Sequence, residues 1–162
     1  MRVRAALCLA AALLGASTAS GEEAACRLGK ARYVQAESRY TIEFLPSPHD
    51  ASTSLSNRFS VRGLEGGTVL SGEVRHANGY GGPWGEITRP CPNEASADSE
   101  PCTVWAGLIY VLGENTVRPL PRETELAPKT LLFPNFSWVI HGISLDKSHI
   151  PADVFQLEGC GP

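Results

Sequence analysis

The chain lacks most of the features that several common functional classes require. Its single methionine is Met1, and beyond residue 19 no apolar run approaches the length of about eighteen residues that a membrane helix needs. Cysteine pairs with C-x(2–4)-C spacing, a G-x-S-x-G motif and clusters of Lys and Arg are all missing. We therefore expect no mature membrane span, no metal or other cofactor, no nucleophile-elbow hydrolase and no nucleic-acid partner.

The first residues, in contrast, have the pattern of an export signal. Two arginines precede a short apolar stretch at residues 5–14, and small residues at 17–19 suit signal peptidase. We expect residues 1–19 to be a signal peptide and residues 20–162 to form a single exported β-rich domain. Removal of those two arginines from the 14 basic residues leaves 12 against 17 acidic ones, so the mature net charge is near −5. The mature protein is then a mildly acidic, periplasmic or secreted domain of ordinary size.

Four cysteines remain after the signal, at Cys26, Cys91, Cys102 and Cys160. Four cysteines allow three connectivities, and Cys91 and Cys102 bracket a polar loop that a disulfide can close easily. That pairing leaves Cys26 near the mature N-terminus to join Cys160 near the C-terminus, because the ends of a domain often lie close together. In an oxidising compartment the even number favours two disulfides over the competing interpretation, a tetrahedral zinc site.

Short apolar bursts between turn-forming residues predict an all-β fold: a single-domain β-sandwich or small barrel of about nine short strands, stapled by two disulfides. The expected strands are 32–36, 40–45, 59–62, 68–75, 104–112, 116–118, 130–133, 138–143 and 154–157. The strongest burst, 104–112, predicts a central strand buried on both faces. Trp105 and Trp138 lie inside two of the bursts and are expected in the core. One helical turn is expected around Pro151, with Ser148 as its cap.

The most unusual stretch runs from His76 to Glu86 and interleaves four glycines with two aromatic residues. One interpretation is a binding loop, in which Tyr80 and Trp84 stack on a sugar or peptide while Asn78, His76 or Glu86 supplies hydrogen bonds. The other is a wide turn whose two rings fold back over the end of the core. The candidate ligand-binding residues are therefore Asn78, Tyr80, Trp84 and Glu86.

No recognisable catalytic set occurs along the chain. The four histidines show no metal-ligand spacing, and His141 is expected to point inward from the strand at 138–143. Glu43, Glu73 and Glu86 are expected to point outward from strands or to lie in loops. A carboxylate pair that the fold itself assembles is the remaining route to an enzyme, because glycosidase carboxylates need not be close in sequence.

Several short segments together resemble a group of exported proteins of unknown function from Gram-negative bacteria. The segments are Ala25-Cys26, Tyr40-Thr41-Ile42-Glu43-Phe44, Asn78-Gly79-Tyr80-Gly81-Gly82, Leu132-Phe133-Pro134-Asn135-Phe136-Ser137-Trp138 and Leu157-Glu158-Gly159-Cys160. The resemblance implies an exported protein with a terminal cysteine pair, and it implies no mechanism. The loop from Cys91 to Cys102 is where this chain departs from that group.

These observations favour a non-enzymatic binding or interaction module whose partner is an envelope protein or a small polar ligand. One form of this hypothesis is an inhibitor-like protein that inserts a rigid loop into a partner's cleft. The loop closed by Cys91 and Cys102 is the second candidate surface for that role, after the Gly-rich stretch. The alternative is a cell-envelope hydrolase that uses fold-assembled carboxylates, and a third hypothesis is a mainly structural envelope protein.

Overall fold

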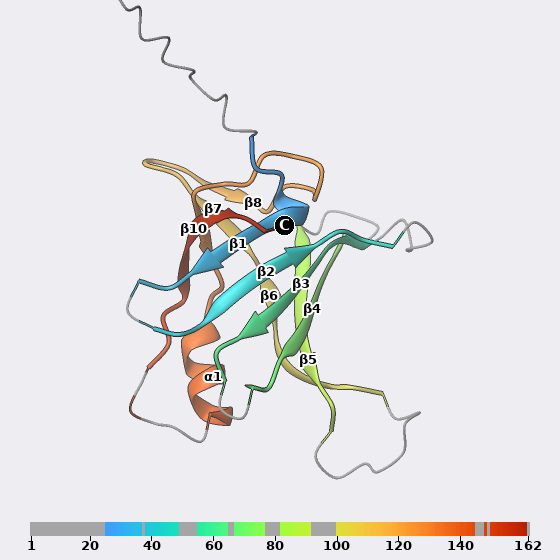
Figure 1. Ribbon diagram of the computed structural model, residues 1–162, viewed down its shortest axis with the longest axis vertical. Coiled ribbons are helices and arrows are strands. Elements are labelled where there is room, and N and C mark those ends of the chain that lie inside the picture. The colour runs from blue at the N-terminus through green and yellow to red at the C-terminus, as the bar shows by residue number, and fades with distance from the viewer. Residues whose placement is uncertain are drawn as a thin grey trace, which may run out of the picture.

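The computed structural model describes residues 25–36, 38–48, 55–64, 67–76, 82–91, 100–144, 148 and 150–161. In this part of the chain, ten strands form one antiparallel sheet that curls into a nearly closed, barrel-like shape (Figure 1). The predicted all-β class is confirmed. A single short α-helix accompanies the sheet, and no helix among these residues is long and apolar enough to span a membrane.

The strands follow the chain from the first described residues to the last. They are β1 (Ala31–Val34), β2 (Thr41–Leu45), β3 (Leu55–Arg62), β4 (Leu70–His76), β5 (Pro83–Arg89), β6 (Cys102–Leu108), β7 (Tyr110–Leu112), β8 (Val117–Pro119), β9 (Thr130–Leu132) and β10 (Val154–Cys160). The 3-10 helix η1 (Leu28–Lys30) precedes β1, and the α-helix α1 (Phe136–Ile143) lies between β9 and β10. Their order across the sheet is β6-β5-β4-β3-β2-β1-β10-β9-β7-β8.

The barrel-like closure depends on a single residue between β6 and β7. These strands lie near opposite ends of the sheet order, yet only Ile109 separates them in sequence, and Ile109 is fully buried. The prediction of one strand over residues 104–112 is therefore wrong, because the burst bends at Ile109 and pairs with different neighbours on each side. Burial on both faces is also wrong, since Thr103 and Ala106 on β6 are exposed.

The segment 138–143, predicted as a strand, forms the helix α1. Phe136 and Ile140 are buried, as expected for positions four residues apart on one helical face. Trp138 falls on the other face and is 80% exposed, so its predicted place in the core is wrong. His141 lies in the last turn of α1 instead of in a strand.

Two further differences concern turns. Residues 150–152 form no helix, so the helical turn expected at Pro151 is wrong. The strand β5 begins inside the Gly-rich stretch, which sequence analysis had taken as loop as far as Glu86. Alternation of buried and outward residues from Pro83 onward satisfies a strand in spite of the glycine at position 85.

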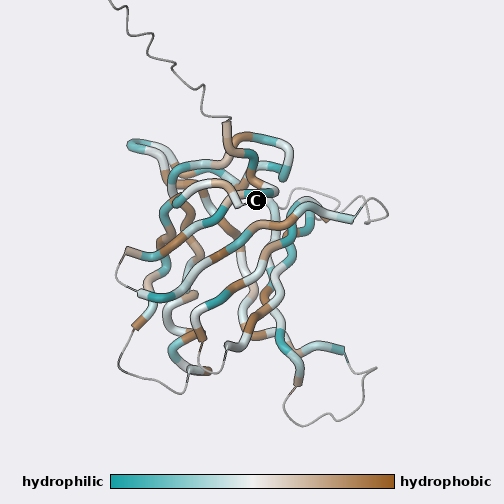
Figure 2. The backbone as a smooth tube through the Cα atoms, in the orientation of Figure 1, coloured by the Kyte–Doolittle hydropathy of each residue, from teal (hydrophilic) through white to brown (hydrophobic). Residues whose placement is uncertain are grey.

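Aromatic and aliphatic side chains fill the interior of the barrel. The ring of Phe133 lies at its centre, with ring-centroid distances of 5.8 Å to Phe59, 5.5 Å to Trp105, 6.1 Å to Phe136 and 5.5 Å to Phe155. Trp105 is buried as predicted, and its indole Nε1 donates to the backbone oxygen of Pro134 at 2.9 Å. Hydrophobic and hydrophilic residues alternate along the strands that surround this core (Figure 2).

Two disulfides join the cysteine pairs expected from the sequence. Cys26 is bonded to Cys160 with a Cα–Cα distance of 5.5 Å, and Cys91 is bonded to Cys102 with a Cα–Cα distance of 5.1 Å. The first pair ties the segment before β1 to the end of β10, its antiparallel neighbour in the sheet. Two such bonds are typical of proteins that mature in an oxidising, exported environment.

The start of α1 depends on the carboxylate of Asp153, which precedes β10. Its two oxygens accept hydrogen bonds from the backbone nitrogens of Asn135, at 3.0 Å, and Ser137, at 2.7 Å. Asn135 has the left-handed φ of 63°, and its own side chain forms no cap. A carboxylate from elsewhere in the chain therefore caps this helix, at the end where the helix dipole favours negative charge.

We expect Asp153→Ala to lower the free energy of unfolding by about 1–2 kcal/mol, because two backbone N–H groups lose their acceptor. Urea unfolding followed by circular dichroism measures the change. Asp153→Asn keeps one side-chain oxygen as an acceptor and should lose less. Equal stability of the Ala variant and the native protein would contradict this role.

Candidate functional site

The outward face of β5 carries Trp84, Glu86 and Thr88. Successive side chains of a strand point to opposite faces, and Pro83, Gly85 and Ile87 fill the buried face. The three outward residues therefore form one row along the outside of the barrel.

The neighbouring strand β4 places a matching row beside it. In the antiparallel register Arg75 lies opposite Trp84, Glu73 opposite Glu86 and Ser71 opposite Thr88. Side chains directly opposite each other in such a pair have Cβ atoms about 4.5–5.5 Å apart. The fold thus brings two carboxylates together from two strands that residues 77–82 separate in the sequence.

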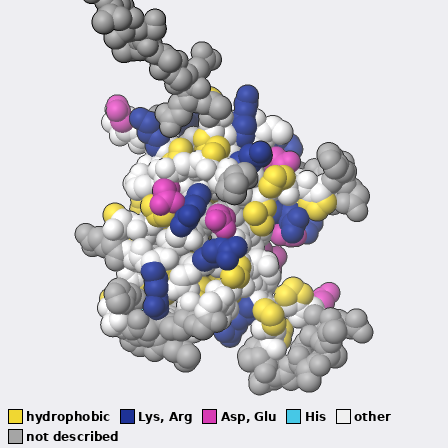
Figure 3. Space-filling view, viewed as in Figure 1, with side chains coloured by type: hydrophobic (Ala, Val, Ile, Leu, Met, Phe, Trp, Pro, Cys, Tyr) yellow, Lys and Arg dark blue, Asp and Glu magenta, His cyan; other side chains and the backbone are white. Residues whose placement is uncertain are grey.

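These two rows and the start of β6 surround a groove of about 400 Å³. Its lining has three carboxylates, one guanidinium, three hydroxyls and one proline: Glu73, Glu86, Glu100, Arg75, Ser71, Thr88, Thr103 and Pro101. With the carboxylates ionised, the lining has a net charge of −2. On the face seen in Figure 3, basic and acidic side chains are interspersed.

The polar groups of the groove are partly satisfied by one another. Arg75 forms an ion pair with Glu73, and the hydroxyl of Thr103 donates to Glu86. The side chains of Arg75 and Glu73 are 52% and 41% exposed, so water still reaches this ion pair. Because an exposed ion pair contributes little to stability, a ligand can replace part of it at small cost.

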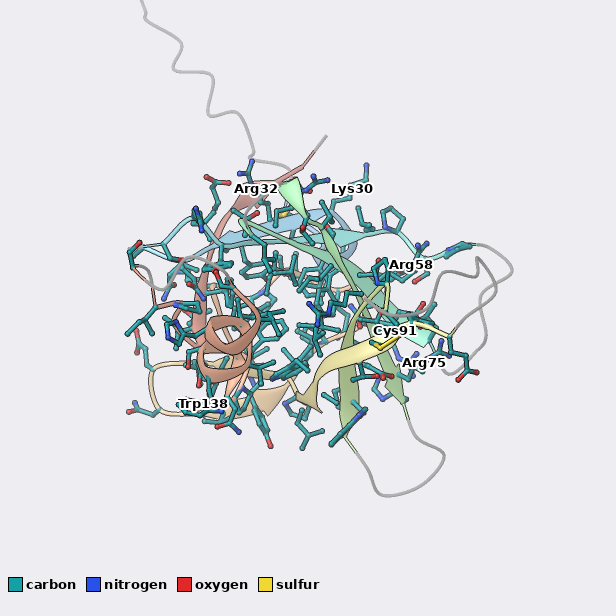
Figure 4. All side chains as sticks on the ribbon, turned by 90° about the horizontal axis from the view of Figure 1, so that it is seen from below. Lys30, Arg32, Arg58, Arg75, Cys91 and Trp138 are labelled. Atoms are coloured by element: carbon teal, nitrogen blue, oxygen red, sulfur yellow. A yellow bond between two sulfur atoms is a disulfide. The ribbon has the colours of Figure 1, made fainter. Side chains whose placement is uncertain are left out.

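Arg58 on β3 extends the charged surface beyond the groove. It lies opposite Glu73 on the side away from Glu86, so Glu73 is flanked by a cation on one strand and a carboxylate on the other. Figure 4 looks along the barrel and shows Arg58, Arg75 and Cys91 on the same side of it, with α1 seen end-on. The positive charge of Arg58 and Arg75 offsets the repulsion between the two facing carboxylates.

The second disulfide fixes one end of the groove. Cys102 opens β6 directly after Glu100 and Pro101, and its partner Cys91 follows the end of β5. Glu100 and Pro101 line the groove, and Thr103 follows Cys102 on its other side. The disulfide therefore ties the segment that carries Glu100 to the residue that follows β5.

Two of the four candidate ligand-binding residues lie on this face. Glu86 lines the groove, and Trp84 stands two residues away on the same side of β5 with 50% of its surface exposed. The interpretation in which Trp84 folds back over the core is therefore wrong. Asn78 and Tyr80 lie outside the described residues.

Sequence analysis missed Arg75, Glu100 and Thr103, and it treated Glu73 as a scattered carboxylate. Alternation over residues 70–76 and 83–89 was the available signal, since it marks the outward positions of each strand. It cannot say which outward residue of one strand faces which residue of the next, because that depends on register.

In the part of the chain that the structure describes, no group of three His, Cys, Asp or Glu side chains is arranged so that it could hold a metal ion. Comparison of the chain with protein-family models, curated proteins and solved structures finds no match.

Proposed function

We propose that this protein is an exported, non-enzymatic binding module that holds a polyhydroxylated ligand, such as a short glycan segment, in the groove on β4, β5 and β6. The observation that carries the proposal is the combination of facing carboxylates, a guanidinium and several hydroxyls with the half-exposed ring of Trp84 on the same sheet face.

The chemistry of the lining fits the hydroxyl groups of a sugar. Carboxylates accept hydrogen bonds, guanidinium groups donate them, and a sugar hydroxyl does both. An indole such as that of Trp84 offers a flat apolar surface to the C–H face of a sugar ring. A groove of about 400 Å³ lies within the size range of small-ligand sites.

The charge of the groove restricts the class of ligand further. The net charge of −2 from three carboxylates and one guanidinium disfavours an anionic ligand, so the ligand is neutral or carries an amino group. Neutral sugars and amino sugars meet this condition, whereas phosphorylated or carboxylated sugars do not.

The cellular location belongs to the same proposal. The N-terminal pattern of residues 1–19 and the two disulfides support export to an oxidising compartment, and the resemblance to exported Gram-negative proteins supports the periplasm. A polyhydroxylated ligand of the cell envelope would be accessible there.

A cell-envelope glycoside hydrolase is the second candidate function, and the facing positions of Glu73 and Glu86 favour it. Retaining glycosidases place two carboxyl groups about 5–5.5 Å apart. A general acid, however, needs a desolvated site that keeps it protonated, and the side chain of Glu73 is 41% exposed beside Arg75. Binding without hydrolysis is therefore the better supported function.

The binding test uses Trp84→Ala and Glu86→Gln. Titration with N-acetylglucosamine, glucosamine, chitobiose and cellobiose, followed by tryptophan fluorescence and calorimetry, should reveal a ligand whose affinity each substitution lowers about tenfold or more. A tenfold loss of affinity corresponds to about 1.4 kcal/mol of binding free energy. For Trp84→Ala, the stacking and the buried area of the indole together can supply this amount.

Trp138→Ala is the matched control, because it removes the other exposed indole from a helix away from the groove. It should leave the affinity unchanged. Equal loss in the Trp84→Ala and Trp138→Ala proteins, or no binding of any sugar, would contradict the proposal. Cleavage of chitobiose by the native protein, and loss of that cleavage in the Glu73→Gln protein, would instead establish the hydrolase.

A further inference from the structure

A second and larger groove of about 780 Å³ lies at another part of the barrel, beside the edge strand β8. Its lining comes from Arg27, from Val111 on β7, from the last two residues of β8 and from the connection between β8 and β9: Arg118, Pro119, Pro121, Glu125, Leu126, Ala127, Pro128 and Lys129. None of these residues lines the groove on β4, β5 and β6, so the two are separate surfaces.

The wall of this second groove is largely apolar. Six of the ten lining residues are Val, Leu, Ala or Pro, and among them Leu126 is 58% exposed. A large aliphatic side chain exposed in a concave site favours an apolar ligand group, because covering it removes apolar surface from water.

The charged residues of the groove are mostly cations, in a chain whose overall net charge is −3. Arg27, Arg118 and Lys129 face only one lining carboxylate, that of Glu125. Within the described ranges neither Arg118 nor Lys129 forms an ion pair. Two exposed cations are therefore available to an anion.

The remaining two charges of the lining are already engaged with backbone groups. The Glu125 carboxylate accepts a hydrogen bond from the backbone nitrogen of Arg122 at 2.7 Å. The guanidinium of Arg27 donates from Nη1 to the backbone oxygen of Thr124 at 2.9 Å, which uses only one of its N–H groups. The first contact fixes the carboxylate of Glu125, and the second fixes the guanidinium of Arg27 at the groove.

The apolar wall is held by the body of the protein. The backbone nitrogen of Ala127 donates to the oxygen of Cys26 at 2.8 Å, and the Tyr33 hydroxyl donates to the oxygen of Pro128 at 2.9 Å. Burial raises the pKa of Tyr33 above its usual range, so its hydroxyl keeps the proton that this bond requires. A preformed wall lowers the entropic cost of binding.

Addition of a peptide strand at β8 is disfavoured. The backbone nitrogen of Leu120 donates to the backbone oxygen of Ile109 at 3.2 Å. Because inward and outward backbone groups alternate along an antiparallel pair, the backbone polar groups of Val117 and Pro119 point away from β7. Pro119 has no N–H, so the free edge offers a single backbone donor, that of Val117. A peptide could form few of the hydrogen bonds that strand addition needs.

We propose that this groove binds a free single-chain amphiphile with an anionic head, a carboxylate or phosphate, whose tail lies against Leu126 and the neighbouring prolines. The head is held by the cations Arg27, Arg118 and Lys129. This site is independent of the proposed sugar groove, since no residue is shared between the two linings.

Calorimetric titration with dodecanoate below its micellar concentration tests this proposal. We expect binding of one molecule per chain, with dodecyltrimethylammonium and acetate at least tenfold weaker because each lacks either the anionic head or the tail. The double variant Arg118→Glu, Lys129→Glu should bind dodecanoate at least tenfold more weakly, and Leu126→Ser should also bind it more weakly.

The control is Lys30→Glu, which reverses one positive charge at an exposed lysine outside the lining, where the test variant reverses two. It should leave dodecanoate affinity unchanged. Thermal unfolding verifies that each variant is folded, and Arg118→Gln, Lys129→Gln replaces the double reversal if that protein unfolds.

Two results would overturn the proposal: no binding of dodecanoate, or equal binding of it by the native and charge-reversed proteins. If monomeric dodecanoate does not bind, cosedimentation with phosphatidylglycerol vesicles but not with phosphatidylcholine vesicles would assign the cations to a membrane surface. Failure of the sugar titration would leave this test unaffected.

Discussion

Removal of the Cys26–Cys160 disulfide by the paired substitution to serine is expected to lower the free energy of unfolding by about 5 kcal/mol. The bond closes a loop with a sequence separation of 134 residues, and the chain-entropy estimate for such a loop gives about this value. The same bond joins the first and last described parts of the chain next to the β1–β10 pair. Urea unfolding of the mature protein without reductant measures the loss.

The other disulfide provides the matched control for this result. Cys91 and Cys102 are separated by 11 residues in sequence, for which the same estimate gives about 3 kcal/mol. Paired serine substitution there should therefore destabilise the protein by less. A larger loss from the short loop than from the long one would contradict the entropic explanation.

Phe133→Ala is expected to lower the free energy of unfolding by about 3–5 kcal/mol, the usual range for a buried aromatic residue replaced by alanine. Phe133 is fully buried and contacts four other aromatic rings. Its replacement by alanine therefore leaves a cavity among these rings and removes their contacts with it. It also lies between β9 and α1, where its backbone nitrogen donates to the backbone oxygen of Asp153 at 2.8 Å. Urea unfolding again measures the change.

Two variants distinguish packing from a general effect of losing an aromatic residue. Phe133→Leu keeps most of the volume and should lose about 1–1.5 kcal/mol. Trp138→Ala removes a larger but exposed ring and should stay within about 0.5 kcal/mol of the native protein. Comparable losses in all three proteins would show that the ring cluster around Phe133 does not dominate the core.

The filled interior has a consequence for function. Aromatic and aliphatic side chains occupy the space inside the curled sheet, so both proposed ligands are placed on its outer surface. One groove is polar and acidic, and the other is apolar with a cationic rim. Their opposite chemistry means that each test can fail without affecting the other.

The sequence by itself determined the features that depend on composition and local pattern. Four cysteines, two of which bracket a short polar loop, were sufficient to predict both disulfide pairs. Short apolar segments between glycines and prolines were sufficient to predict the all-β class, because strands alternate with turns whichever strands later pair with one another. Trp84 and Glu86 could be selected as candidates because an aromatic and a charged residue interleaved with glycines can be recognised in the sequence, whereas the exposure of Trp84 came from the structure.

Only the tertiary structure decided which strands meet and where bursts of apolar residues bend. A run such as 138–143 has the composition of a strand or of a short helix, and a distant carboxylate, Asp153, caps it as a helix. Residues 104–112 become two strands because the sheet curls and Ile109 enters the core between them. Glu73 faces Glu86 through a register that long-range pairing sets, and local preferences carry no information about such pairings.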